Sequence, residues 1–425
     1  MYEAAAQAWL QLAEIDFRQG RSPHESFEHA LEVIDDRALR ADPDDAAVYT
    51  IKSDVLLRSY RTTSRAGQGD LRPLLERIAE AAARAVEIDP SAARAWDALG
   101  YAHLYRGRYE DSQGRRGDPW WDQALDEIGK ALTIQPDDPR ANNDLGAVHR
   151  WLGTRLDWAG RDPMPEYRAA LRSYERATEL DPKYVHACSN QVDLHTSIAE
   201  YEDAIGVDPR SAIGNARRAG ERCLAIDPHF YSLLDNLAQV QLALAHYLAE
   251  SGSDPTAALA SARDYLDRFE KVQFETMTLW YHRLVAATTE ATFRLRQGVD
   301  PARSIATGRT AFKDALRLNP DAAEPYVQAA RLDLVEAAWA AHGANGPMPM
   351  LARALADAER AIALDGQLAA ARLAAAEACL QIATARPSRA VIDRGIDYVD
   401  QALGRNPRLA RAQAVRVALS RLRAR

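Results

Sequence analysis

The amino-acid sequence predicts an all-α fold in which helical hairpins stack into a solenoid. A short string that closes on proline recurs along the chain, and the prolines at positions 90, 136, 182 and 228 are each 46 residues apart. A fixed period of roughly 20–50 residues is typical of repeat architectures. Alanine, leucine, arginine and glutamate are frequent, which favours helix. The copies of the string are Ala85–Pro90, Ala131–Pro136, Tyr174–Pro182, Cys223–Pro228 and Ala315–Pro320.

A second motif, glycine followed shortly by aspartate and proline, lies between the copies of the first. Its clearest versions are Gly206–Pro209, Gly252–Pro255 and Gly298–Pro301. Glycine adopts the left-handed conformation that ends a helix. Aspartate accepts hydrogen bonds at the start of the next helix, and proline suits the first helical position. Each period therefore holds a helix A, from about Tyr184 to Ala204 in one unit, and a helix B, from about Pro209 to Ile226.

These two motifs divide the whole chain into nine units and a terminal helix. A repeat array suits a chain of 425 residues, because each unit packs only on its neighbours. No linker interrupts the series, so we expect one solenoid domain over residues 1–425 with a C-terminal capping helix over 408–425. The units close near Pro43, Pro90, Pro136, Pro182, Pro228, Phe274, Pro320, Gly366 and Pro407.

One unit departs from the pattern by carrying bulky residues. Phe269 replaces a small helix B residue, Phe274 replaces the closing proline, and Leu284 replaces a glycine. Bulk at a helix crossing predicts a wider helix spacing. Compensated substitution within an unchanged framework is the alternative.

Charge, hydropathy and terminal sequence restrict the function classes. The net charge of −8 argues against a general nucleic-acid binder, which needs a basic face. No run of about 18 apolar residues predicts a membrane helix, and the N-terminal segment lacks the pattern of a signal peptide. The three cysteines show no CxxC spacing. We therefore expect a cytoplasmic protein with reduced cysteines.

Within each period, the residues resemble the tetratricopeptide repeat. That pattern has an aromatic residue and leucine-glycine in helix A, small residues in helix B and a closing Asp-Pro. The resemblance implies a right-handed superhelix whose concave face, lined by helix A, binds proteins or peptides. Small residues let neighbouring helices approach closely. The matching positions are Trp96, Leu99, Gly100, Ala124, Ile128, Ala131 and Pro136, and in the next copy Leu145, Gly146, Ala170, Tyr174, Ala177 and Pro182.

The repeat length departs from that family. Its period is about 34 residues, so each unit here has about 12 more. These residues lengthen helix A by roughly two to three turns, or they form a loop such as Ser112–Trp120. HEAT and armadillo arrays have periods of about 40–47 residues and are the alternative fold. The Leu-Gly and Ala…Ala…Asp-Pro signature favours tetratricopeptide-like units.

The turn motifs also resemble the C-terminal repeat arrays of large bacterial serine/threonine protein kinases. The chain has no glycine-rich phosphate loop and no HRD or DFG motif. This resemblance implies that the chain corresponds to a non-catalytic sensor or substrate-docking part of such a kinase.

The sequence offers no catalytic or metal-binding constellation. The segment His24–His29 separates its histidines by five residues, whereas a zinc helix needs four. The acidic turns Asp42–Asp45 and Asp137–Pro139 lack the ligand spacing of a calcium loop. We therefore predict that the chain is not an enzyme and that it uses no cofactor and no metal.

The C-terminal segment is rich in arginine and carries no acidic residue. An apolar side formed by Leu409, Val415, Leu419 and Leu422 predicts a capping helix. A docking site for an acidic partner or nucleic acid is the alternative. The arginines are Arg405, Arg408, Arg411, Arg416, Arg421, Arg423 and Arg425.

The predicted partner-binding residues come from helix A of two adjacent units. Positions seven, eleven, fourteen and fifteen after the closing proline are expected to face outward. Tyrosine, tryptophan and arginine among them most often dominate binding energy. The alternative is burial of these residues against the next unit. The candidates are Asp97, Tyr101, Tyr105, Asn143, Arg150 and Trp151.

The sequence therefore predicts a non-catalytic scaffold or regulatory module for a protein or peptide partner. Chaperone-binding arrays clamp a C-terminal carboxylate with lysines, and no lysine occupies the corresponding positions here, so that ligand is not expected. Nucleic-acid binding is an alternative that needs a basic stripe. Homo-oligomerisation stays open.

Overall fold

The computed structural model describes residues 2–18, 23–65, 71–112, 117–273, 275–341 and 346–424. Over these ranges the chain is helical and contains no strand. Phe274 and Arg425 lie outside the described residues, as do residues 113–116 of the loop predicted between Ser112 and Trp120.

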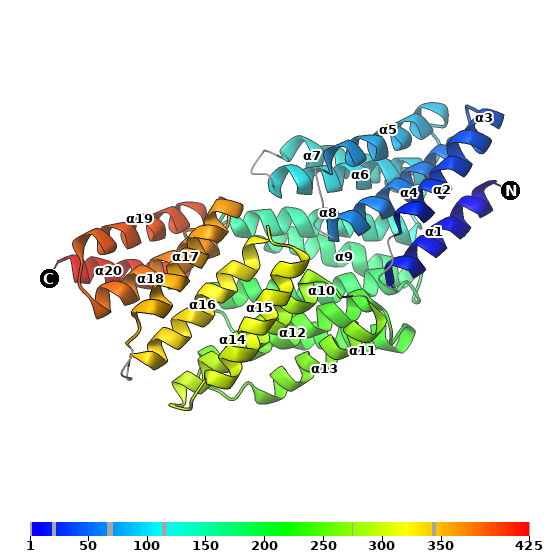
Figure 1. The fold of residues 1–425 in the computed structure, drawn as a ribbon. Coiled ribbons are helices and arrows are strands. Elements are labelled where there is room, and N and C mark those ends of the chain that lie inside the picture. The colour runs from blue at the N-terminus through cyan, green and yellow to red at the C-terminus, as the bar shows by residue number, and fades with distance from the viewer. Residues whose placement is uncertain are drawn as a thin grey trace. The chain divides into compact units, whose positions relative to one another are not determined.

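Within the described ranges, A and B helices alternate along the chain, and one further helix follows the last pair. Figure 1 shows consecutive helices lying side by side, as in α16–α17 and α18–α19. The A helices are α1 (Tyr2–Arg18), α4 (Ala46–Arg65), α6 (Ala93–Ser112), α8 (Pro139–Trp158), α10 (Val185–Ala204), α12 (Tyr231–Glu250), α14 (Met277–Arg296), α16 (Ala323–Ala340) and α18 (Ala369–Ala385). The B helices are α2 (His24–Glu32) with the π-helix η1 (Val33–Ala38) and α3 (Leu39–Ala41), then α5 (Arg72–Ile88), α7 (Asp118–Ile134), α9 (Met164–Leu180), α11 (Arg210–Ile226), α13 (Thr256–Val272), α15 (Ala302–Leu318), α17 (Met348–Leu364) and α19 (Arg389–Arg405). The terminal helix is α20 (Ala410–Arg423).

The chain forms two compact units. Unit 1 comprises Met1–Leu152, Pro165–Gln191 and Glu270–Glu275. Unit 2 comprises Gly153–Met164, Val192–Phe269 and Thr276–Arg425.

The additional residues of each repeat belong to both helices. Helix α10 has 20 residues and α11 has 17, and α12 and α13 repeat these lengths. Of a 46-residue period, 20 and 17 are therefore helical and only nine remain for two turns. The bounds predicted for α10 and α11 agree with the observed ones to within one residue.

The turn between helices A and B has the predicted chemistry. Gly206 adopts a φ of +77°, in the left-handed region that favours glycine. The Oδ1 atom of Asp208 accepts a hydrogen bond of 3.0 Å from the backbone N–H of Arg210. Pro209 immediately precedes the first helical residue instead of occupying it as predicted. The same aspartate hydrogen bond recurs at Asp162, Asp254 and Asp300.

Small residues sit where helices A and B cross. A Cβ atom at Gly146 would lie 2.6 Å from carbon atoms of the Tyr174 ring, which is itself buried. A Cβ at Gly100 would lie 2.6 Å from Cγ1 of Ile128. These separations are far below van der Waals contact, so glycine is required for the observed approach.

The bulky residues of the divergent unit are accommodated in the core. Phe269 is 4% exposed and Leu284 is fully buried. Helices α13 and α14 keep the lengths of 17 and 20 residues. The repeat thus keeps its helix lengths around these substitutions.

The terminal helix α20 packs as the next helix of the array. Val415 and Leu419 are buried together with Leu373, Ala376 and Val399 of α18 and α19. The apolar side predicted from the sequence is therefore the side that covers the end of unit 2.

No described helix has both the length and the apolar character that a membrane crossing requires.

The expectation of three reduced cysteines is wrong, because Cys188 and Cys223 are disulfide-bonded. Disulfides persist in oxidising compartments, so the cysteines give no support to a cytoplasmic location. Cys379 is free and buried.

Candidate partner-binding surfaces

The A helices of unit 1 are joined by a charge network around the partly buried Arg140. Its Nη2 atom lies 3.0 Å from Oδ1 of Asp54 on α4, and its Nε atom lies 3.0 Å from Oδ2 of Asp97 on α6. Burial raises the pKa of Asp54, but Arg140 and Arg94 outweigh burial and the net pKa is lowered. Burial, with the nearby charge of Asp144, raises the pKa of Asp97 well above its usual range. The pKa of one carboxyl is thus lowered and that of the other is raised, although both contact the same guanidinium.

Neighbouring A helices also pair through polar side chains at a fixed offset. The Nδ2 atom of Asn190 donates a hydrogen bond of 2.8 Å to Oδ1 of Asn143. In unit 2, Nδ1 of His282 lies 2.9 Å from Oδ1 of Asp235. Both pairs are separated by 47 residues, one repeat plus one residue. The residue at position seven of one repeat therefore contacts the residue at position eight of the next repeat.

Two of the six predicted binding residues belong to these contacts. Asp97 is 1% exposed and Asn143 is 4% exposed. Position seven faces the neighbouring A helix instead of solvent, because the long A helices pack side by side. For these two residues the burial alternative is correct.

The other four predicted residues gather on α6 and α8 and are half-buried. The rings of Tyr101 and Tyr105 meet edge to face with centroids 5.2 Å apart. The guanidinium of Arg150 lies 4.9 Å from the centroid of Trp151. Both arrangements are attractive for aromatic rings.

Sequence reasoning missed two members of this group. The guanidinium of Arg108 lies 4.0 Å from the centroid of Trp151 and 5.2 Å from that of Tyr105. The ring of Tyr60, on α4, lies 5.1 Å from Tyr105. Extending the helical spacing by one turn past position fifteen would have found Arg108. We call the set the aromatic patch: Tyr60, Tyr101, Tyr105, Arg108, Arg150 and Trp151.

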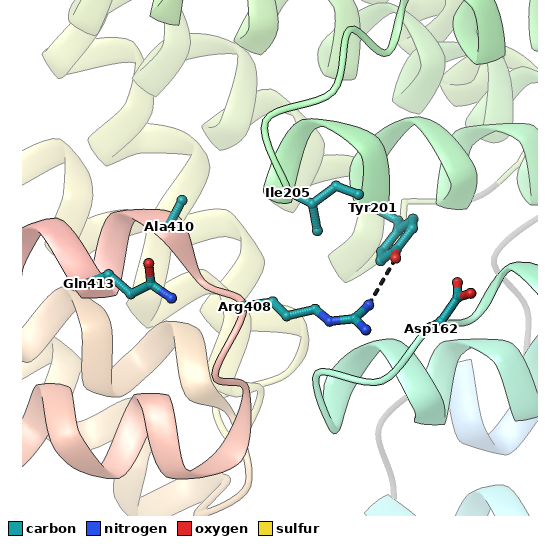
Figure 2. Close-up of a pocket in the computed structure, with 6 residues that line it drawn as sticks. All are labelled: Asp162, Tyr201, Ile205, Arg408, Ala410 and Gln413. Atoms are coloured by element: carbon teal, nitrogen blue, oxygen red, sulfur yellow. Dashed lines mark hydrogen bonds between the residues drawn. The ribbon is translucent and has the colours of Figure 1, made fainter.

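A second surface lies in unit 2, where the turn before α20 meets α10. Figure 2 shows Arg408 pointing toward Tyr201, with Asp162 close to the same end of the side chain. The Nη1 atom of Arg408 donates a hydrogen bond of 2.9 Å to the hydroxyl of Tyr201. The pocket around them has a volume of about 540 Å³. Its lining residues are Asp162, Tyr201, Ile205, Arg408, Ala410 and Gln413.

Histidine–carboxylate pairs connect helix A to helix B within single repeats. Nδ1 of His103 lies 2.6 Å from Oε2 of Glu127, and the same atom of His149 lies 2.8 Å from Oε2 of Glu166. Over the described ranges, no three histidine, cysteine, aspartate or glutamate side chains are arranged to hold a metal ion.

The comparisons with known proteins identify the fold. No protein-family model matches the chain, and no curated protein matches it. Among solved structures, the chain is similar to human IFIT1 in a dimer with m7Gppp-AAAA, with a TM-score of 0.52 and 11% identity over 98% of this chain and 82% of that chain. It is also similar to a tetratricopeptide repeat protein from Parabacteroides merdae, with a TM-score of 0.45 and 15% identity over 76% and 99% of the two chains. A third match is a chain of the APC/C hetero-tetramer Cut9–Hcn1, with a TM-score of 0.49 and 12% identity over 94% of this chain and 60% of that chain.

At 11% identity, the match with a TM-score of 0.52 indicates a shared fold without indicating a shared ligand. The match with a TM-score of 0.52 and the helical repeats of this chain agree with each other. The chain is an all-α solenoid of tetratricopeptide-like helical repeats.

Proposed function

We propose that the chain is a non-catalytic interaction module that binds a protein or peptide partner through the aromatic patch. The observation that carries this proposal is the stacking of Arg108 and Arg150 on Trp151, on helices of two adjacent repeats. Rigid aromatic rings and arginines are the residue types that dominate interface energies. Apart from Tyr60, which is buried beneath them, the side chains of the patch are half-buried, so little side-chain entropy is lost on binding.

The charge of the patch selects the partner. Arg108 takes part in stacking, and no salt bridge of the described residues includes it. Its guanidinium donors are therefore available to a carboxylate, for which arginine offers matching bidentate geometry. We infer that the partner segment carries an acidic residue next to an apolar or aromatic one, which the rings of Tyr101 and Tyr105 would contact.

A library of random peptides displayed on phage tests this proposal with the full chain as bait. We expect selected peptides to share an acidic residue beside an apolar one. We also expect the Trp151→Ala variant to lose them while Trp158→Ala, altered at a 60% exposed tryptophan outside the patch, retains them. Peptides without acidic residues, or peptides that bind both variants equally, would contradict the proposal.

Single-stranded nucleic acid is the competing ligand, because bases also stack on aromatic rings and arginine. The two ligands differ in their response to salt. Nucleic-acid affinity falls steeply as salt increases, because phosphate contacts release counterions. Tight, salt-sensitive binding of an oligonucleotide that requires Trp151 would replace the peptide proposal.

A further inference from the structure

Unit 2 is closed by contacts between segments that are far apart in the sequence. The side-chain Nδ2 of Asn406, in the turn before α20, donates a hydrogen bond of 3.0 Å to the backbone oxygen of Asp157 at the end of α8. Arg408, in the same turn, donates to the hydroxyl of Tyr201 on α10. These contacts span 249 and 207 residues. Stacking of consecutive repeats does not produce them, because it joins residues about one repeat apart.

The turn between α8 and α9 is shaped to receive this segment. Gly160 has a φ of +65°, and a Cβ atom placed on it would lie 2.8 Å from Oδ1 of Asn406 and would collide with the Pro407 ring. Gly206 occupies the same position one repeat later with a φ of +77°, and nothing lies within 4 Å of its Cβ position. The two A–B turns therefore have the same left-handed backbone conformation at glycine, but the turn at Gly160 is covered by Asn406 and Pro407.

The first turn of α20 extends the contact to two further A helices. The Nε atom of Arg411 lies 2.5 Å from Oε1 of Glu377 on α18, and its Nη1 atom lies 3.8 Å from Oε2 of Glu250 on α12. Burial raises the pKa of the Asp157 carboxyl to about 6, against the opposing charge of Arg408. The docked segment thus places an arginine near Asp157 and arginines against acceptors on α10, α12 and α18.

We propose that residues 406–411 form a clasp that closes unit 2 on itself and covers its helix A surface at Tyr201 and Glu250. A partner that reaches this surface has to displace the clasp. The covered surface presents a tyrosine hydroxyl, a backbone carbonyl and carboxylates, so the segment that competes for it carries arginine. The clasp is separate from the aromatic patch.

The distance between spin labels at Ala159→Cys and Ala414→Cys, both exposed positions, measures the state of the clasp in the full chain. We expect a short, narrow distance distribution for the otherwise unchanged protein. Replacing Asn406 and Arg408 by alanine removes two hydrogen bonds, and each lost bond should raise the open fraction about fivefold. The control is Arg416→Ala on α20, the helix that carries one of the labels. The partner of Arg416 is Asp400 on α19, outside the clasp. Unchanged distances in the double variant would overturn the proposal.

A second pair of variants separates the clasp from general damage to the fold. Gly160→Ala and Gly206→Ala carry the same cost of a left-handed backbone. Only the first creates a collision with Pro407 and Asn406, so only the first should lengthen the label distance. Equal distances in the two variants would refute the clasp even if both lose stability. None of these measurements involves a partner, so their outcome is independent of the proposed function.

Discussion

The guanidinium of Arg108 lies 4.0 Å from the centroid of the Trp151 ring, and this stacking joins helix α6 to helix α8. The two residues come from adjacent repeats, so the repeat geometry determines their distance. A surface assembled in this way is positioned by rigid helices, which reduces the entropy lost when a partner binds.

The aromatic patch should carry most of the affinity for a selected peptide. We expect Trp151→Ala and Tyr105→Ala each to weaken binding about 30-fold, because truncating a hot-spot aromatic costs about 2 kcal/mol. Fluorescence anisotropy with a labelled peptide measures the loss, and circular dichroism verifies that the helices remain. Trp158→Ala is the matched control. Normal binding by both patch variants would place the site elsewhere.

Arg140 should be essential for the stability of unit 1. We expect Arg140→Ala to lower the free energy of unfolding by about 3 kcal/mol, because the partly buried carboxylate of Asp54 loses its main counter-charge and Asp97 loses its partner. Arg94→Ala removes only a 60% exposed partner of Asp54 and should cost less than about 1 kcal/mol. Urea denaturation followed by circular dichroism compares them. Equal losses would show that Arg140 is not the centre of the network.

Close approach of helices should make Gly146 intolerant of a methyl group. We expect Gly146→Ala to destabilise the protein by about 1–3 kcal/mol, because the new Cβ meets the buried Tyr174 ring. Gly129→Ala is the control, because nothing lies within 4 Å of its Cβ position. That change should stabilise helix α7 by about 0.5–1 kcal/mol. A neutral Gly146→Ala variant would mean that the helices separate easily.

Asp357 should make unit 2 less stable as the pH rises. Burial and then the charge of Asp333 raise the pKa of Asp357 from 3.8 to about 6, against Arg353 and Arg309. Because the folded-state pKa is the higher one, the stabilising contribution is complete below about pH 3.8 and is lost as the pH passes 6.

Asp357→Asn removes this titration. The variant should match the unchanged protein near pH 4 and exceed its stability by about 1 kcal/mol at pH 7.5. This figure is discounted from the full shift, because the side chain is partly exposed. Urea denaturation between pH 4 and 8 measures the difference. A difference that stays constant with pH would show that Asp357 does not titrate in this range.

The repeat, the helix boundaries and the turn chemistry could be predicted from the amino-acid sequence. These features depend on local interactions. A left-handed glycine, an aspartate that caps the next helix and a small residue at each helix crossing recur with the period of the chain. The bounds of α10 and α11, the left-handed conformation of Gly206 and the small residue at Gly146 could therefore be predicted from the sequence.

The side of an A helix that faces its neighbour could not be predicted in this way, and neither could the segments that meet across many repeats. Asp97 and Asn143 are buried because the side of the A helix that carries them packs on the neighbouring A helix. Which side does so depends on how two helices pack together, and the periodicity of a single helix does not show it. The hydrogen bond between Arg408 and Tyr201 joins residues that are 207 positions apart, and no local pattern in the sequence indicates it.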